Sequence, residues 1–142
     1  MRITNSCDVK PGLVMYHVYG CNRTDTIINE RDISVYTVLS MPENHIGAYS
    51  DVNLGDFIKV NIQYYAGDEL RTYNSESSLN DMGILDGKCA YNLNRVFTTK
   101  AEALLFMAEL QNNTFSYPDD IKFASKDTRF DSIKWASDFN FF

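Results

Sequence analysis

The segment VFTTKAEALLFMAEL, residues 96–110, decides how the fold is interpreted, because it predicts the end of a strand, a capped turn and a helix. Thr99 and Glu102 have the spacing of a capping box, in which each side chain can bind the backbone amide of the other residue. Ala, Leu, Met, Lys and Glu dominate the residues that follow, and all of them are good helix formers. Asn112-Asn113-Thr114 then favours a helix end, so we expect a helix over about residues 99–112.

The predicted helix has two apolar arcs on opposite sides, whereas a surface helix needs only one apolar stripe. The first arc contains Ala101, Leu104, Leu105 and Ala108, and the second contains Ala103, Phe106, Met107 and Leu110. We therefore expect both sides to be covered, with Leu104 and Leu105 in a packed core. The second arc is covered either by the chain's own C-terminal tail or by another chain, which makes Phe106 and Leu110 candidates for partner binding.

Length and composition indicate one globular domain over residues 1–142, of which 44% are hydrophobic. No apolar run is long enough to span a bilayer, and the first residues lack the apolar core of a signal peptide. We therefore expect a cytoplasmic protein without membrane association. The cysteines and histidines are Cys7, Cys21, Cys89, His17 and His45. They form no CxxC pair or other metal-ligand spacing, so we expect reduced thiols, no metal site and no cofactor.

The net charge of −6 is concentrated in residues 51–87, where seven acidic and two basic residues give a net charge of −5. The acidic residues are Asp51, Asp56, Asp68, Glu69, Glu76, Asp81 and Asp86. No basic stripe is present, so direct binding to nucleic-acid phosphates is disfavoured. The acidic segment is either a solvated surface or a surface that attracts a basic protein partner, and its residues are our candidate partner-binding residues.

The part of the chain before the helix is predicted to be rich in β-strands. Strands are expected at residues 13–19, 26–28, 32–40, 56–65, 69–73 and 89–97, with long loops at 41–54 and 74–88. The first strand is apolar throughout, as expected for a central strand, and His17 should be a buried, hydrogen-bonded side chain within it. In the strand at 56–65, alternate residues from Ile58 to Tyr64 are apolar, which predicts one buried and one exposed face.

The tail, residues 114–142, combines short helical patterns with many aromatic residues. Pro118-Asp119-Asp120 can open a short helix, and residues 127–137 could form another. We expect the aromatic side chains of the tail to pack on the second arc of the main helix, within one chain or exchanged across a homodimer. The tail residues that are candidates for partner binding are Trp135, Phe141 and Phe142.

Strands first and helices afterwards predict an α+β fold rather than βαβ alternation. We expect a small antiparallel curled sheet or barrel over about residues 10–97, followed by one main helix and a partly helical tail. The layout includes Lys10-Pro11-Gly12-x-Val14-x-Tyr16, Ile27-Ile28-x-Glu30 and Tyr91-x-Leu93-x-x-Val96-Phe97-x-Thr99-x-x-Glu102-Ala103. This layout, over roughly residues 10–110, resembles small accessory proteins encoded by large tailed bacteriophages.

The resemblance implies an SH3-like β-barrel, a phage setting and a place in the host cytoplasm, because such proteins place an SH3-like barrel before a helix introduced by V-F-x-T-x-x-E-A. It implies no catalytic residue, since the residues of the pattern are structural. This chain departs from the pattern by its longer loops at 41–54 and 74–88 and by its added tail.

The sequence contains no GxGxxG, Walker loop, GxSxG or HExxH motif, which favours a non-enzymatic protein. The first function class is a phage accessory protein that binds and modulates a host or defence protein. The alternatives are an enzyme of unrecognised type, acting on a nucleotide or other small molecule with His17 or His45, and a minor virion structural protein. A deep pocket lined by a histidine and carboxylates would favour the enzyme, whereas a flat acidic or aromatic surface would favour the binding protein.

Overall fold

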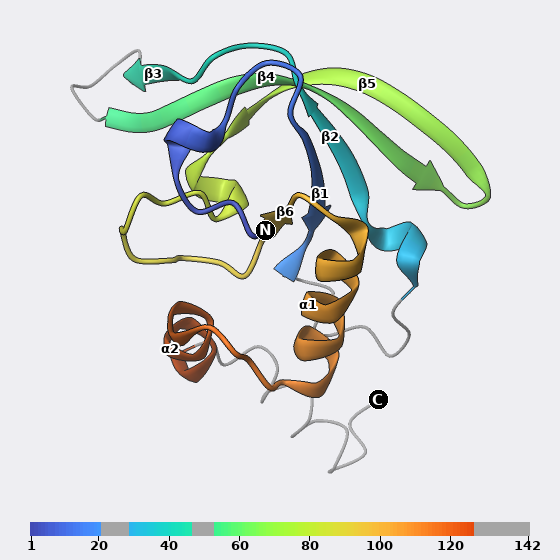
Figure 1. The fold of residues 1–142 in the computed structure, drawn as a ribbon, viewed down its shortest axis with the longest axis vertical. Coiled ribbons are helices and arrows are strands. Elements are labelled where there is room, and N and C mark those ends of the chain that lie inside the picture. Colours follow the sequence, from blue (N-terminus) through green and yellow to red (C-terminus); the bar gives the residue numbers. More distant parts are fainter. Residues whose placement is uncertain (21–28, 47–52, 127–142) are drawn as a thin grey trace, which may run out of the picture.

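The computed structural model describes residues 1–20, 29–46 and 53–126, and it confirms the α+β class. Within these residues, a six-stranded antiparallel sheet is combined with two α-helices (Figure 1). The strands are β1 (Val14–Val18), β2 (Ser34–Val38), β3 (Glu43–Ile46), β4 (Asn53–Ala66), β5 (Glu69–Ser78) and β6 (Arg95–Phe97). The helices are α1 (Lys100–Asn112) and α2 (Pro118–Lys126), with 3-10 helices η1 (Ser6–Asp8), η3 (Glu30–Asp32) and η4 (Asn80–Met82).

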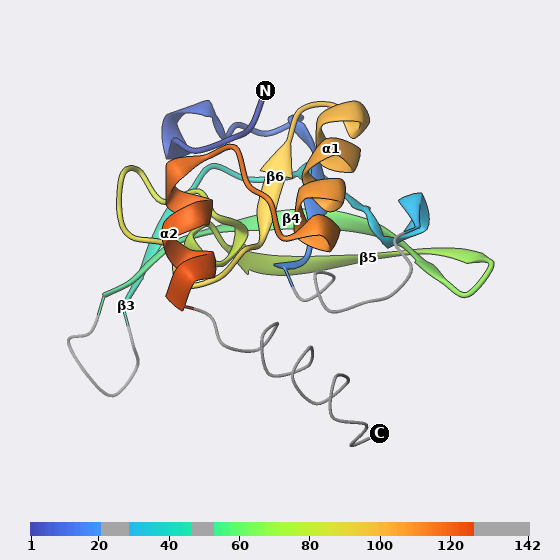
Figure 2. The ribbon, with the colours of Figure 1, turned by 90° about the horizontal axis from the view of Figure 1, so that it is seen from below.

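Strand β4 organises the sheet, because it pairs with β2 and β3 along one edge and with β5 along the other. The strand order is β3-β4-β2-β1-β6, with β5 beside β4, and β1 is central as predicted. In the described part of the chain the sheet curls without closing into a barrel (Figures 1 and 2). The SH3-like assignment therefore stays a prediction, while the curled antiparallel sheet is confirmed.

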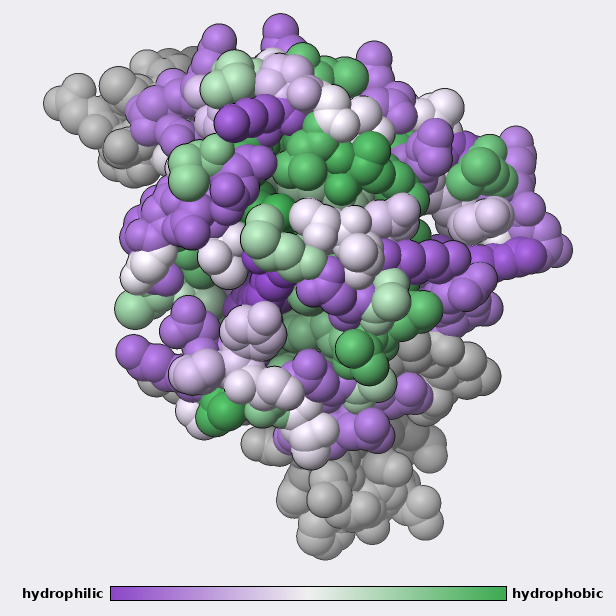
Figure 3. All heavy atoms as spheres, in the orientation of Figure 1, coloured by the Kyte–Doolittle hydropathy of each residue, from purple (hydrophilic) through white to green (hydrophobic). Residues whose placement is uncertain are grey.

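The first core lies between the curled sheet and the segment that runs through η4. In β4, Ile58, Val60 and Ile62 are buried while Lys59 and Gln63 are exposed, as the alternation predicted. Other members of this core are Ile3, Val9, Met15, Tyr36, Val38, Leu79, Met82, Ile84 and Val96. On the face seen in Figure 3, hydrophobic residues gather near the centre, and hydrophilic residues dominate the margins and the end of the β4–β5 hairpin.

The second core lies between the sheet and α1, and it corrects the prediction about the two arcs of the helix. The second arc is the buried one, because Ala103, Phe106, Met107 and Leu110 pack with Val18, Ile33, Leu93 and Phe97. The first arc is not in a core, since Leu104 is 36% exposed and Leu105 is 68% exposed. Both arcs are apolar, so the direction in which the chain leaves β6 determines which arc of α1 faces the sheet.

The ends of α1 follow the local signals in the sequence. Thr99 is the N-cap, and its hydroxyl accepts a hydrogen bond from the Glu102 amide at 3.3 Å. The Glu102 carboxylate accepts from the Thr99 hydroxyl at 2.7 Å and from the Met1 ammonium. Asn113 ends the helix in the left-handed conformation, with φ of 52°. The predicted helix and its capping threonine are therefore confirmed, but the Glu102 carboxylate binds the Thr99 hydroxyl and not, as predicted, the Thr99 amide.

Several strand boundaries differ from the prediction, because polar residues can form strands where one face meets solvent. The expected loop at 41–54 contains β3 and the start of β4, and the expected loop at 74–88 contains the end of β5 and η4. Pairing with β4 continues as far as Ser78, so the polar run from Asn74 is strand. By contrast, the last strand begins only at Arg95. The predicted strand at 26–28 lies outside the described residues.

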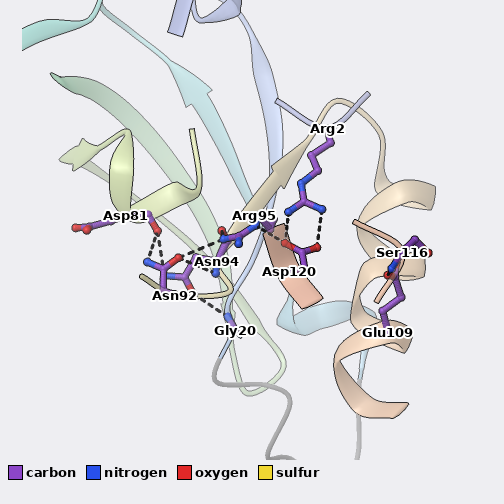
Figure 4. Close-up of polar contacts among 9 residues, drawn as sticks. All are labelled: Arg2, Gly20, Asp81, Asn92, Asn94, Arg95, Glu109, Ser116 and Asp120. Carbon is purple, nitrogen blue, oxygen red and sulfur yellow. Dashed lines mark hydrogen bonds and ion pairs between the residues drawn. The ribbon is translucent and has the colours of Figure 1, made fainter. Parts of the chain in front are cut away.

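Helix α2 begins at Pro118 as predicted, and it lies on the same side of the β4–β5 hairpin as α1 (Figures 1 and 2). Phe115 and Phe123 pack against the second core, so this part of the tail covers α1 within one chain. Buried charges also connect α2 to the rest of the fold. The Asp120 carboxylate accepts hydrogen bonds from Arg2 at 2.7 and 2.5 Å and from Arg95 at 3.1 Å (Figure 4). The predicted helix at 127–137 lies outside the described residues.

Candidate functional site

A groove of about 340 Å³ lies at one end of the curled sheet, and we call it the aromatic groove. It is lined by His17, Tyr19, Tyr36, Phe57, Glu76, Ser77, Ser78, Asp81, Met82, Asn92 and Asn94. These residues come from β1, β2, β4, β5, η4 and the approach to β6, so the curl of the sheet assembles the groove from distant parts of the sequence. The mouth of a curled or barrel-like sheet is a common place for a binding site.

The aromatic side of the groove consists of three rings, of which His17 and Tyr36 are buried and Tyr19 is exposed. His17 pairs with Ser34 across the β1–β2 ladder, and Tyr36 lies two residues further along β2 on the same face. The His17 and Tyr36 rings are stacked at 4.7 Å with an interplanar angle of 10°, and the Tyr19 ring meets His17 edge-on at 4.3 Å. The Tyr19 and Tyr36 hydroxyls are hydrogen-bonded at 3.2 Å. These contacts hold the three rings in fixed orientations.

His17 is uncharged at neutral pH, because burial lowers the pKa of its imidazole to about 4. Its side chain is buried as predicted, but Nδ1 has no hydrogen-bond partner among the described residues, so the predicted hydrogen bond is not found there. Burial, together with the hydrogen bond to Tyr19, also raises the pKa of Tyr36. The rings therefore present a neutral surface, and the charge of the groove comes from its rim.

The polar wall of the groove is held by hydrogen bonds between backbone and amide groups. The side chains of Asn92 and Asn94 each donate to the Asp81 carbonyl, at 3.0 and 3.1 Å (Figure 4). The Gly20 amide donates to the side-chain oxygen of Asn94 at 2.8 Å, which ties the end of β1 to this wall. Tyr91 donates its hydroxyl hydrogen to the Asp81 carboxylate. The Asp81 carboxylate is therefore held in position at the exposed rim.

The predicted acidic segment does not form one surface. Glu76 and Asp81 are the two acidic residues that line the aromatic groove, and Glu76 lies opposite the exposed Lys59 in the β4–β5 ladder. Asp68 and Glu69 lie at the β4–β5 turn and pair with arginines, Asp68 with Arg31 at 2.6 Å and Glu69 with Arg71 at 3.1 Å. These two surface pairs neutralise much of the charge at the tip of the hairpin.

The remaining predicted acidic residues lie elsewhere. The Asp56 carboxylate accepts a hydrogen bond from the Asn44 side chain at 3.2 Å, at the pairing of β3 with β4. The Asp86 carboxylate accepts from the Ser6 amide at 2.7 Å and so helps to hold the N-terminal segment. Asp51 lies outside the described residues. A sum of charge along the sequence cannot distinguish these structural roles from a free acidic surface.

The predicted apolar partner-binding residues need a correction. Phe106 and Leu110 lie in the second core, at 2% and 0% exposure, so they do not form a surface that a partner could contact. They are buried because α1 turns this arc toward the sheet. Trp135, Phe141 and Phe142 lie outside the described residues, and their predicted role stays a prediction.

Sequence reasoning missed Tyr19, Tyr36, Asn92 and Asn94 as parts of a site. The groove residues share no spacing in the sequence, and only the alternation of β1 and β2 indicates which of the rings share a face. Among the described residues, no three His, Cys, Asp or Glu side chains are grouped closely enough to hold a metal ion. Cys7 and Cys89 are exposed free thiols, and Cys21 lies outside the described residues.

No helix in the described part of the chain is long and apolar enough to cross a membrane. No curated protein and no solved structure matches the chain. A family model for Phage g100-like proteins matches residues 3–110, from the N-terminal segment to the last turn of α1. The match includes the aromatic groove, ends before α2 and covers more than half of the chain. The chain therefore belongs to the family of Phage g100-like proteins.

Proposed function

We propose that this phage protein is a non-enzymatic accessory protein that acts in the host cytoplasm by binding and modulating a host or defence protein. The observation that carries the proposal is the aromatic groove, where the exposed residues Glu76 and Asp81 line the same hollow as the stacked rings of His17 and Tyr36. A lysine or arginine side chain of the partner fits this combination. Carboxylates form charge-assisted hydrogen bonds with a guanidinium or ammonium group, and aromatic rings attract the same cations.

The free edge of β5 supports a protein partner rather than a small cation. Within the described residues, β5 pairs with β4 and with no other strand, so its second edge is open. Glu76 lies on this strand, and Ser77 and Ser78 continue it into the groove. An extended peptide could add to the open edge through main-chain hydrogen bonds while its basic side chain enters the groove. The edge would then provide affinity and the groove specificity.

The experiment compares capture of host proteins by the wild type with capture by the double variant Glu76→Gln, Asp81→Asn. These substitutions remove both charges with little change in size, and an asparagine at position 81 can still accept a hydrogen bond from Tyr91. The matched control is Glu69→Gln at the β4–β5 turn, which removes one acidic charge away from the groove. Melting temperatures should first show that all three proteins are folded.

We expect a host protein to be retained by the wild type and by the control but lost from the double variant. Binding of that protein, once purified, should weaken as the salt concentration rises. Equal retention by the wild type and the double variant would contradict a role for the groove carboxylates. An unchanged affinity between low and high salt would contradict a charged anchor.

The groove also supports a second candidate function, an enzyme acting on a nucleotide or other small molecule, because a histidine and two carboxylates line it. His17 would be the base in such a reaction, although its pKa of about 4 makes it a weak one at neutral pH. This candidate predicts that a nucleotide shifts the NMR signals of His17 and Tyr19. If nucleotides leave these signals unchanged while the host protein shifts them, the binding protein is favoured.

A further inference from the structure

The outer side of β5 is an open sheet edge along most of the strand. Strand β5 pairs with β4 through ten consecutive residue pairs without a register shift, and the end of this hairpin extends beyond the helices (Figures 1 and 2). Among the described residues, no further strand pairs with β5. Residues 69–74 and 76 are exposed, so the described part of the chain leaves this stretch of the edge in contact with solvent.

The hydrogen bonds of the hairpin determine which backbone groups of β5 point outward. The Leu79 amide donates to the Asp56 carbonyl at 2.9 Å, and the same register continues to the pair of Ala66 with Glu69 at the two-residue turn. Hydrogen-bonded and non-hydrogen-bonded pairs alternate in an antiparallel ladder, so the odd-numbered residues of β5 bond to β4. The even-numbered residues direct their amides and carbonyls outward. Ser78 is buried, so the accessible ones are Leu70, Thr72, Asn74 and Glu76.

This edge lacks the features that usually prevent an edge strand from pairing. Native edge strands are typically protected by proline, by lysine or by a bulge. Residues 69–78 contain neither proline nor lysine, and the ladder with β4 contains no bulge. Arg71 is engaged by Glu69 within the same strand at 3.1 Å. The Ser75 hydroxyl donates to the Glu76 carbonyl at 3.2 Å, a local bond that a strand amide can replace. The edge is therefore ready to accept another strand.

The arrangement of the outward groups is suited to a second copy of β5. Two copies related by a two-fold axis perpendicular to the sheet pair antiparallel, with the same residue of each strand at the axis. The accessible outward residues run from 70 to 76, so their midpoint is Tyr73. With the axis there, Leu70 lies opposite Glu76 of the second copy, and Thr72 lies opposite Asn74 of the second copy. All accessible outward amides and carbonyls are then in hydrogen-bonded pairs.

The side chains of β5 agree with this register. The Tyr73 ring, now 47% exposed, would meet the same ring of the second copy in a non-hydrogen-bonded pair, where side chains lie closest and aromatic pairs are stabilising. Arg71 is on the same face and diagonal to the second ring, within reach of a cation–π contact. Glu69 and Arg71 lie opposite Ser77 and Ser75 of the second copy, so no like charges face each other.

We propose that the protein forms a homodimer in which β5 pairs antiparallel with β5 of a second copy, with the two-fold axis at Tyr73. The two curled sheets become one continuous sheet across this interface. Glu76, Ser77 and Ser78 continue the edge into the aromatic groove, so a second copy and an added peptide compete for the same strand. The dimer is a resting form that closes the edge, and its formation does not depend on the proposed host partner.

The first test measures the mass of the full chain by sedimentation equilibrium from micromolar to millimolar concentration. Tyr73→Lys brings two ammonium groups together at the axis and Tyr73→Glu brings two carboxylates together, and like charges opposite each other prevent pairing. An equal mixture of these variants brings opposite charges together instead. Leu105→Lys is the matched control, because it introduces the same charge at an exposed apolar residue of α1. Melting temperatures show that each variant is folded.

A second measurement, amide hydrogen exchange by NMR, identifies the strand edge. The amides of Thr72 and Asn74 point away from β4, so they gain a hydrogen bond only when the second copy is paired. Their exchange should slow as the concentration of the wild type rises. In Tyr73→Lys it should stay fast at every concentration. A dimer that forms through another surface would leave both amides unaffected.

We expect a concentration-dependent equilibrium between monomer and dimer for the wild type. Each Tyr73 variant alone should raise the dissociation constant of the dimer about tenfold or more, and their mixture should recover the dimer. Leu105→Lys should behave as the wild type. A wild type that stays monomeric at millimolar concentration, a mixture no more dimeric than either variant, or dissociation by Leu105→Lys would overturn the proposal. These measurements involve no host protein, so their failure is distinct from failure of the proposed function.

Discussion

At the scale of single residues, Asp119 and Asp120 are neighbours in the sequence with opposite environments. Asp119 is exposed, whereas Asp120 is fully buried and is the acceptor for both Arg2 and Arg95. We expect Asp120→Asn to lower the free energy of unfolding by about 3–5 kcal/mol, because it leaves two guanidinium groups buried without their counter-charge. Denaturation in urea measures this loss.

Asp119→Asn is the control for that experiment, and it should change the free energy of unfolding by less than about 0.5 kcal/mol, as for most surface substitutions. The two variants remove the same charge from adjacent positions of one helix turn. Similar losses in both would mean that the buried position of Asp120 is not what stabilises the link between α2 and the sheet.

The buried imidazole of His17 makes stability depend on pH. Its pKa is about 6.5 in the unfolded chain and about 4 in the folded protein, so the unfolded chain binds a proton first as the pH falls. The stability from this residue is fully present above about pH 6.5, and about 3 kcal/mol of it is lost by pH 4. We expect His17→Phe, which keeps a ring against Tyr36, to lose correspondingly less stability between pH 7 and pH 4.

Urea denaturation at several pH values checks this, with the difference between the two proteins as the measured quantity. The carboxylates titrate in both proteins, so their contribution cancels in the difference. Parallel curves for the wild type and the variant would show that His17 is hydrated or hydrogen-bonded in the folded protein.

At the scale of elements, α1 has one packed and one exposed apolar arc. Phe106 is in the second core, and its neighbour Leu105 is 68% exposed. We expect Phe106→Ala to cost about 3–5 kcal/mol through the cavity it leaves. Leu105→Asp should change the free energy of unfolding by less than about 0.5 kcal/mol, because its side chain already faces water. A large loss in Leu105→Asp would show that the outer arc is covered in solution.

At the scale of the whole molecule, α2 is tied to the N-terminal segment of the chain by the contact of Asp120 with Arg2. Truncation after Asn113 removes Asp120 and also Phe115 and Phe123, which pack against the second core. We therefore expect a lower melting temperature and aggregation, measured by thermal unfolding and light scattering. Truncation after residue 126 keeps α2 and is the control. Equal melting temperatures and monodisperse samples in both cases would contradict a structural role for α2.

The sequence by itself determined the elements whose signals are local. Thr99 and Asn113 mark the ends of α1, Pro118 marks the start of α2, and the alternation from Ile58 to Tyr64 marks the buried face of β4. These predictions were correct because caps and periodicity depend on residues within one or two turns or pleats of each other. The α+β class followed from their order.

Only the tertiary structure decided which apolar arc of α1 is buried. Phe106 and Leu105 are both apolar, and the direction in which the chain runs from β6 into α1 determines which of them faces the sheet. It also decided the aromatic groove, because strand register places His17 and Tyr36 on one face of the sheet. The link from Arg2 to Asp120 spans 118 positions. Interactions over such separations form only when the whole sheet folds, so no local pattern in the sequence predicts them.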